Sequence, residues 1–127
     1  MFGRKKSKMS EKDLRWNRFI DEICNKDIDT LSETQKKAVL CFWYDAEVNS
    51  GGHCGYFDCY PETNPQELIE AITEVSYKAI ADNFEKALSD QCDENLEKAD
   101  KAFYDFSPEL GDCLMEYVEK HKDVIFG

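Results

Sequence analysis

Apolar residues recur every three to four positions through most of the chain, which is the spacing of amphipathic helices. The first such segment follows Ser10 and carries Trp16, Phe19, Ile23 and Cys24 on one face. No run of alternating β-branched and polar residues is present, so the sequence offers no candidate strand. We therefore predict an all-α fold, a compact single-domain bundle of about six helices with short connections and no sheet.

Capping residues mark where the predicted helices begin. Ser32-Glu33-Thr34-Gln35 is a capping box, in which Gln35 can reach back to the Ser32 amide. Asn64-Pro65 and Ser107-Pro108 both read as an N-cap followed by proline at the first helical position. Ser76 is a further candidate cap, and a fifth helix is expected to begin near Asp93. The last helix should end near His121.

A glycine pair interrupts the pattern after a long apolar helix. Asn49 is followed by Gly51 and Gly52, and then by the aromatic pair Tyr56 and Phe57. We expect one of the glycines to adopt a positive φ, since glycine has no Cβ to oppose it. Tyr56 and Phe57 should then pack against the helix that ends at Asn49. A phosphate-binding loop is excluded, because no strand precedes the glycines and no Gly-Lys-Ser/Thr follows them.

The charge is strongly acidic and unevenly distributed. The chain of 127 residues has 27 acidic and 16 basic residues, a net charge of −11 and a pI of about 4.6. Residues 1–20 nevertheless hold seven basic and two acidic side chains, so the remainder carries −16. We expect residues 1–9 to be a flexible basic tail and residues 10–127 to be one helical domain. The basic segment could contact an anionic surface or the protein's own acidic body, or simply aid solubility.

The expected cellular compartment follows from two features that the sequence lacks, a membrane-spanning segment and a secretory signal. No segment approaches the ~20 apolar residues that a membrane-spanning helix needs. The basic start is not followed by an apolar stretch, so it is not a secretory signal. The six cysteines are therefore expected to be reduced thiols in a cytoplasmic protein.

Acidic residues form rows at helical spacing. The longest row falls opposite the apolar face of the last predicted helix, and consecutive acids at this spacing repel one another. A stripe without neutralising bases could be offered to a basic partner, although acidic helix faces are often merely solvated. Two shorter rows occur upstream. The candidate partner-binding acids are Glu109, Asp112, Glu116, Glu119 and Asp123, with Glu67, Glu70 and Glu74; the third row is Asp93, Glu97 and Asp100.

Two blocks of sequence resemble a family of small, acidic, helical bacterial proteins whose namesake is a DNA-mimic protein. The first block is residues 47–52 (Glu-Val-Asn-Ser-Gly-Gly) with Tyr56-Phe57, and the second is residues 96–104 with 114–118. The likeness spans about residues 31–125. It departs from the family pattern at His53, where a large apolar residue is usual, and at Cys59, where Asn is common. The resemblance implies a helical fold and a protein that can imitate the phosphates of DNA.

Catalytic and metal chemistry is weakly indicated. His53, Cys54 and Cys59 are close in sequence but lack the Cys-x-x-Cys spacing of a structural zinc site. A nucleophile and base at His53-Cys54 would be adjacent in a turn, which rarely gives the required geometry. Asp27-x-Asp29 starts like a calcium loop, but Leu31 stands at a ligand position. We expect no catalytic residues, no metal site and no cofactor.

Three functions are therefore kept open. The first is a non-enzymatic acidic protein that mimics DNA and occupies the basic surface of a DNA-binding regulator or nucleoid protein. The second is an immunity or inhibitor protein that neutralises a nuclease or other basic toxin. The third is a small metal-binding protein or enzyme centred on His53, Cys54 and Cys59. The acidic body should not bind nucleic acid directly, and a homodimer is compatible with the sequence, which does not fix the oligomeric state.

Overall fold

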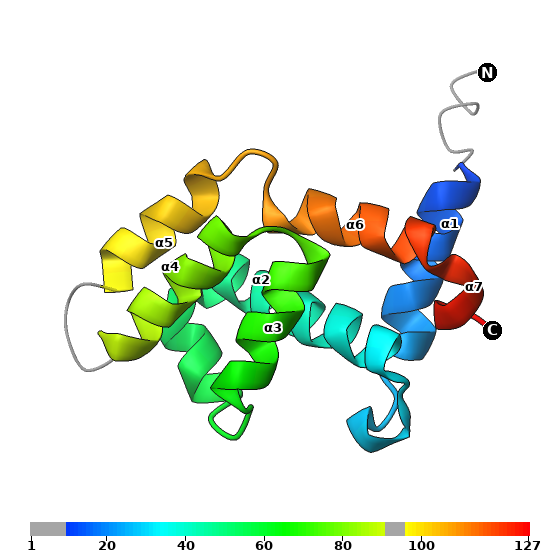
Figure 1. Cartoon of the computed structure of the whole chain (residues 1–127), viewed down its shortest axis with the longest axis horizontal. Coiled ribbons are helices and arrows are strands. Elements are labelled where there is room, and N and C mark those ends of the chain that lie inside the picture. Colours follow the sequence, from blue (N-terminus) through cyan, green and yellow to red (C-terminus); the bar gives the residue numbers. More distant parts are fainter. Residues whose placement is uncertain (1–9, 91–95) are drawn as a thin grey trace, which may run out of the picture.

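The computed structural model describes residues 10–90 and 96–127, and 81% of these residues are helical, with no strand among them (Figure 1). The predicted all-α fold is confirmed. Seven α-helices lie in this part of the chain, together with a π-helical turn at Phe19–Ile23 and a 3-10 turn at Ile28–Thr30. The α-helices are α1 (Glu11–Arg18), α2 (Glu33–Cys59), α3 (Pro65–Val75), α4 (Lys78–Ser89), α5 (Leu96–Asp105), α6 (Leu110–Lys120) and α7 (Lys122–Ile125).

Helix α2 is the central element. It contacts α3, α5, α6 and α7 directly. In Figure 1, α4 and α5 lie at one end of the molecule, whereas α1 and α7 lie together at the other end. Helices α3 and α6 pack on α2 between these ends and also contact each other. This arrangement brings the two acidic rows predicted for separate helices into the same region.

Three of the predicted helix starts are confirmed. The Ser10 hydroxyl accepts a hydrogen bond from the third residue of α1. Ser32 and Gln35 form the reciprocal capping box at the start of α2. Asn64 caps α3 and Pro65 is its first residue. These caps satisfy amide groups that have no partner within their own helix.

Two predicted caps are wrong by one or two residues. The hydroxyl of Ser76 donates to the Ile72 carbonyl at the end of α3, and α4 starts after Tyr77 instead. The N-cap of α6 is Glu109, so Pro108 precedes the helix rather than opening it. The Pro108 carbonyl accepts a hydrogen bond from the Tyr77 hydroxyl at 2.7 Å, which ties the two connections together. The predicted tail and the start of the fifth helix near Asp93 lie outside the described residues.

The glycine pair makes a kink rather than an end to helical structure. Gly52 has φ 71° and ψ −174°, and the chain is helical on both sides of it. The prediction of a positive φ is confirmed at Gly52, while Gly51 belongs to the incoming helix. The Asn49 side chain donates to the Asp45 carbonyl at 2.8 Å in the last turn before the kink.

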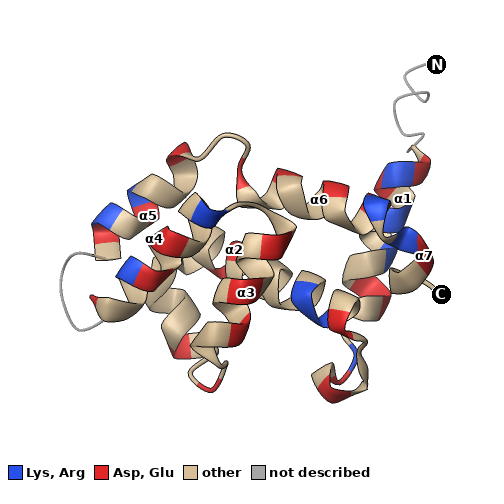
Figure 2. Cartoon of the chain, in the orientation of Figure 1, with Lys and Arg blue, Asp and Glu red and all other residues tan. Residues whose placement is uncertain are grey.

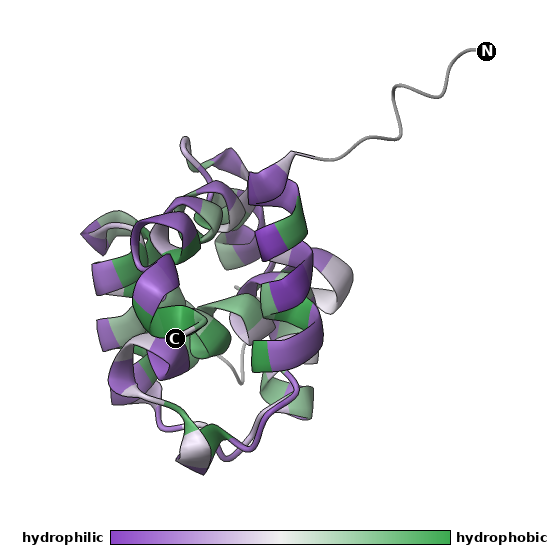
Figure 3. Ribbon diagram, turned by 90° about the vertical axis from the view of Figure 1, so that its right-hand side faces the viewer, coloured by the Kyte–Doolittle hydropathy of each residue, from purple (hydrophilic) through white to green (hydrophobic). Residues whose placement is uncertain are grey.

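The kink folds aromatic residues back onto the first half of α2. The Tyr56 ring lies 5.2 Å from the ring of Tyr44, as predicted, whereas Phe57 contacts the ring of Phe84 in α4 at 6.2 Å. Tyr44 is fully buried and also contacts Phe103 of α5. Figure 3, viewed along the long axis of Figure 1, shows hydrophobic and hydrophilic positions alternating along the helices, as expected for amphipathic helices that share a core. The core therefore surrounds the kinked helix.

Candidate acidic interface

Acidic residues from α3 and α6 meet at a surface groove of about 340 Å³. Glu74 contributes from α3, and Asp112 and Glu116 contribute from α6, while Val75 and Tyr117 form part of the apolar lining. Figure 2 shows acidic positions along both helices. We use the name acidic face for the exposed acids of these two helices, namely Glu67, Glu70 and Glu74 with Glu109, Asp112 and Glu116.

Glu74 is held firmly in place at this groove. One carboxylate oxygen accepts from Lys37 Nζ at 2.8 Å, and the other accepts from the Tyr117 hydroxyl at 2.5 Å. The Lys37 ammonium, with the tyrosine hydroxyl, lowers the pKa of Glu74 below its usual range. Glu74 therefore connects α2, α3 and α6 while remaining partly exposed.

The predicted stripe of unneutralised acids on the last helix is wrong in its second half. Glu119 accepts two hydrogen bonds of 2.7 Å from the Arg15 guanidinium of α1, and Lys12 of α1 forms an ion pair with Glu116. The Glu119 side chain is only 19% exposed. Figure 2 shows basic positions on α1, which lies beside the end of α6 that is farther from α5. Lys12 and Arg15 thus contact the protein's own acidic body, which was one of the three roles considered for the basic N-terminal segment.

Helix geometry also separates Asp123 from the stripe. Helix α6 ends at Lys120, and Asp123 lies in the short helix α7. Its side chain is exposed. The acids of the stripe therefore do not form one continuous row.

Several candidate acids have no neutralising partner in the part of the chain that the structure describes. Glu67 pairs with Lys36 at 3.1 Å, but Glu70 forms no ion pair or side-chain hydrogen bond there. Glu109 and Asp112 are also exposed and without such partners. Glu70, Glu109 and Asp112 are thus the acids of the acidic face that have no ion pair within the described residues.

Asp45 adds a partly buried carboxyl group beneath the start of α6. Burial, followed by the nearby charges of Glu109 and Asp112, raises the pKa of Asp45 to about 6. A Cβ atom at Gly111 would lie 3.3 Å from its carboxylate, so Asp45 is close to the first turn of α6. This region is crowded with negative charge.

The third predicted row of acids is not a surface row. Glu97 is exposed, but Asp100 turns inward toward the kink, and Asp93 lies outside the described residues. The Asp100 carboxylate accepts hydrogen bonds from the backbone N–H of His53 at 2.8 Å and from its Nδ1 at 2.6 Å. Asp100 therefore holds the kink of α2 through His53 and does not belong to a surface row of acids.

His53 is fully buried and both of its ring nitrogens have partners. Burial lowers the pKa of His53 and outweighs the opposing effect of Asp100, so the ring is neutral near pH 7. In that state Nδ1–H donates to Asp100 and Nε2 accepts from the Tyr44 hydroxyl at 2.6 Å. A buried ring with both nitrogens engaged has no access to a substrate or metal ion.

The structure does not bring His53, Cys54 and Cys59 together into one centre. Cys54 and Cys59 are exposed whereas His53 is buried, and Cys59 contacts Glu47 at 3.6 Å. No group of three metal-ligating side chains occurs in residues 10–90 and 96–127. The five cysteines within these ranges are free thiols, and burial raises the pKa of Cys24 to about 12.

Sequence reasoning missed two sets of residues that shape this surface and its support. Lys12 and Arg15 were counted as part of a basic segment. Their spacing of three residues could have placed them on one face of a helix, but not against α6. Asp100 was placed in an acidic row, although it belongs to a block that resembles the family. Its neighbours Ala99 and Phe103 are buried, which places Asp100 near the edge of the core.

Comparison with known proteins identifies the family of this chain. The family model of DMP19-like proteins matches residues 29–121. Searches of curated proteins and of solved structures gave no match. No helix in the described ranges is long and apolar enough to span a membrane. The match covers most of the chain and confirms the resemblance to the DNA-mimic proteins, so the chain belongs to the DMP19-like protein family.

Proposed function

We propose that this protein is a non-enzymatic DNA mimic whose acidic face occupies the basic surface of a DNA-binding protein. The observation that carries the proposal is the convergence of Glu74, Asp112 and Glu116, from two helices, around one groove. Membership of the DMP19-like family supports it. The proposed partner is a regulator or nucleoid protein in the cytoplasm.

The geometry of the two helices suits phosphate mimicry. Acids three to four residues apart on a helix are separated by about 5 Å along its axis. Phosphates of one DNA strand recur every ~3.4 Å along the duplex axis, and the phosphates of the two strands border each groove. The acidic face likewise places carboxylates on both sides of a groove, Glu74 on α3 and Asp112 and Glu116 on α6. Lys37 pairs with Glu74, Lys12 pairs with Glu116, and Lys120 also lines the groove, so Asp112 is the groove acid without an ion pair in the described residues. A lysine- and arginine-rich DNA-binding surface could contact both rows.

Rigid placement of the charges favours this role. Glu74 is fixed by Lys37 and Tyr117, so the groove keeps its shape without a partner. Glu70, Glu109 and Asp112 are exposed, have no ion pair within the described residues, and are available to basic side chains. Association through such charges is expected to be fast and sensitive to salt.

The test compares two variants with the same change in net charge. The acidic-face variant carries Glu70→Gln, Glu109→Gln and Asp112→Asn. The matched control carries Glu85→Gln, Glu97→Gln and Asp105→Asn, which are exposed acids of α4 and α5. Each full-length protein is immobilised, exposed to an extract of the native cell, and washed at two salt concentrations. Bound proteins are then eluted with duplex DNA.

A DNA mimic should capture basic proteins that duplex DNA releases. The acidic-face variant should lose them and show a flatter dependence of log K on log salt, whereas the control should retain them. Equal capture by both variants would show that these acids are only a solvated surface. Capture of one very tightly bound enzyme that DNA does not release would favour the alternative, an immunity or inhibitor protein.

A further inference from the structure

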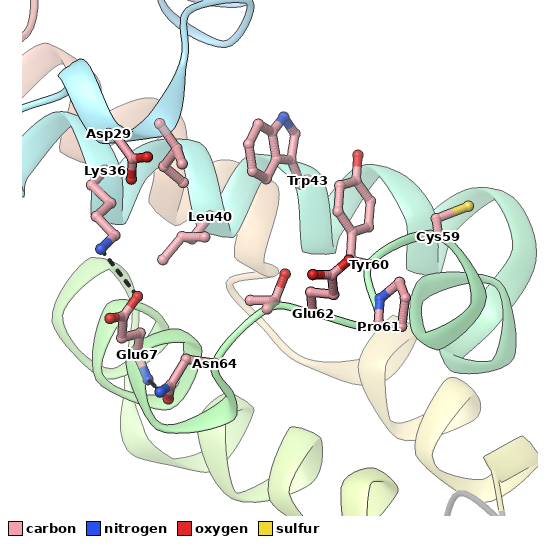
Figure 4. Close-up of a pocket in the computed structure, with 12 residues that line it drawn as sticks. Asp29, Lys36, Leu40, Trp43, Cys59, Tyr60, Pro61, Glu62, Asn64 and Glu67 are labelled. Carbon is pink, nitrogen blue, oxygen red and sulfur yellow. Dashed lines mark hydrogen bonds and ion pairs between the residues drawn. The ribbon is translucent and has the colours of Figure 1, made fainter.

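A second pocket, of about 470 Å³, lies between the first half of α2 and the segment that follows Cys59 (Figure 4). Trp43 and Tyr60 form its aromatic wall, and Asp29, Lys36 and Glu62 contribute charged groups. Its volume is in the range typical of small-ligand sites. It shares no lining residue with the groove between α3 and α6.

The aromatic wall is a product of the kink. The rings of Trp43 and Tyr60 stack with centroids 5.4 Å apart and an interplanar angle of 13°. These residues are separated by most of α2, and the turn at Gly52 brings them together. Both side chains are only half-buried, so part of each ring is open to solvent. A second aromatic ring, Tyr56, stacks on Tyr60 at 5.4 Å and supports it from the core.

The charged groups leave the pocket negative. Lys36 is paired with Glu67 at 3.1 Å, which Figure 4 shows on one side of the pocket. The carboxylates of Asp29 and Glu62 have no ion pair or hydrogen bond within residues 10–90 and 96–127. Asp29 and Glu62, whose carboxylates have no ion pair within the described ranges, therefore line the same pocket as a pair of stacked aromatic rings.

We propose that this pocket binds an arginine side chain of the basic partner. A guanidinium group is planar, weakly hydrated and able to stack on aromatic faces, and it pairs with carboxylates through two parallel hydrogen bonds. A lysine ammonium has the same charge but neither the plane nor the fork of donors. Phosphate-bearing ligands are disfavoured by the two carboxylates. The nature of the partner rests on the proposed function, whereas the arginine site rests on the pocket itself.

Intrinsic fluorescence can report this binding directly. The chain has two tryptophans, and Trp16→Phe leaves Trp43 as the sole indole. Trp16 lies among Phe19 and Phe42, so phenylalanine keeps its aromatic surroundings. The full-length Trp16→Phe protein is titrated with a blocked Gly-Arg-Gly peptide, with its lysine counterpart and with its neutral isostere containing citrulline.

The arginine peptide should change the Trp43 emission in a saturable way. The citrulline peptide should bind at least about tenfold more weakly, because it lacks the positive charge. The lysine peptide should fall between them. Equal binding of the arginine and citrulline peptides, or no saturable change with arginine, would overturn the proposal.

Variants locate the site. In the Trp16→Phe background, Glu62→Gln and Asp29→Asn should each weaken arginine binding several-fold. Glu85→Gln, which makes the same charge change on α4, should leave it within about twofold, as expected for a distant exposed charge. All three positions are exposed, so the fold should persist, and melting temperatures check this. Equal effects of Glu62→Gln and Glu85→Gln would show that the peptide senses only net charge.

The experiments distinguish failure of the arginine site from failure of the DNA-mimic proposal. The acidic-face variant, with Glu70, Glu109 and Asp112 neutralised, should bind the arginine peptide like the parent protein. If the pocket binds no arginine while the acidic-face variant still loses its captured partners, the DNA-mimic proposal stands without this anchor. If arginine binds but the acidic-face variant captures the same partners, the pocket stands and the mimic proposal falls.

Discussion

Asp100 joins the two halves of the kinked helix α2 through His53, accepting both its backbone N–H at 2.8 Å and its Nδ1–H at 2.6 Å. The carboxylate comes from α5 and lies directly over Gly52, where a Cβ atom would be 2.4 Å from its Oδ2. The His53 Nε2 in turn accepts a hydrogen bond from the Tyr44 hydroxyl in the first half of α2. The kink, the buried network and the position of α5 are thus one structural unit.

Replacing Gly52 by alanine should destabilise the protein by more than about 1 kcal/mol. Alanine at φ 71° is strained, and its Cβ would collide with the Asp100 carboxylate. Gly51→Ala is the matched control, since Gly51 is helical and a Cβ there meets nothing within 4 Å. Urea denaturation should show a loss for Gly52→Ala and none for Gly51→Ala. Similar stability of the two variants would refute the role assigned to Gly52.

Stability should fall as the pH is lowered below about 6.5, the ordinary pKa of histidine. Burial lowers the pKa of His53 in the folded protein, so the unfolded chain takes up the proton first. Protonation then favours unfolding, by at most about 1.4 kcal/mol per pH unit for one group. Urea titrations at pH 7.5, 6.5 and 5.5 should show this slope, and His53→Phe should reduce it. An unchanged slope in His53→Phe would assign the acid sensitivity to other groups.

Asp45→Asn should stabilise the protein at neutral pH by roughly 2 kcal/mol, after allowing for solvent screening of a partly buried group. The pKa of Asp45 is raised to about 6, so the folded protein holds an unfavourable charge above that pH. This penalty shrinks as the pH falls from about 6 toward the ordinary carboxyl pKa. The gain from Asp45→Asn should therefore be large at pH 7.5 and small at pH 4. Because this slope opposes that of His53, the histidine titration is best repeated in the Asp45→Asn protein. A gain that is equal at both pH values would point to relief of packing rather than charge.

The pair Arg15–Glu119 should anchor α1 to α6 with a coupling energy of about 1 kcal/mol. Its two hydrogen bonds are 2.7 Å long and both side chains are mostly covered, which strengthens a charged pair. A double-mutant cycle with Arg15→Met and Glu119→Gln measures the coupling. The comparison pair is Lys78–Asp82, whose side chains are 81% and 50% exposed. That pair should couple by less than about 0.5 kcal/mol. Equal coupling in the two cycles would remove any special role for the Arg15 contact.

The sequence by itself determined the helical class and most helix starts, because these depend on local properties. Apolar spacing and the side chains of Ser10, Ser32 and Asn64 act within a single turn of helix. A positive φ at the glycine pair was predictable for the same reason. The predicted caps at Ser76 and Ser107 were wrong, since contacts such as that between Tyr77 and the Pro108 carbonyl shifted the boundaries.

Only the tertiary structure decided which charges remain available and which residues meet. Helical spacing placed Glu116 and Glu119 on one face, but the packing of α1 gave them Lys12 and Arg15 as partners. The acidic groove, the Asp100–His53 network and the stacking of Trp43 on Tyr60 each join residues distant in sequence. A sequence pattern reports the faces of one helix, whereas pairing and burial depend on how separate helices pack. The acidic composition was therefore evident from the sequence, whereas the arrangement of the acids into a face could not be predicted from it.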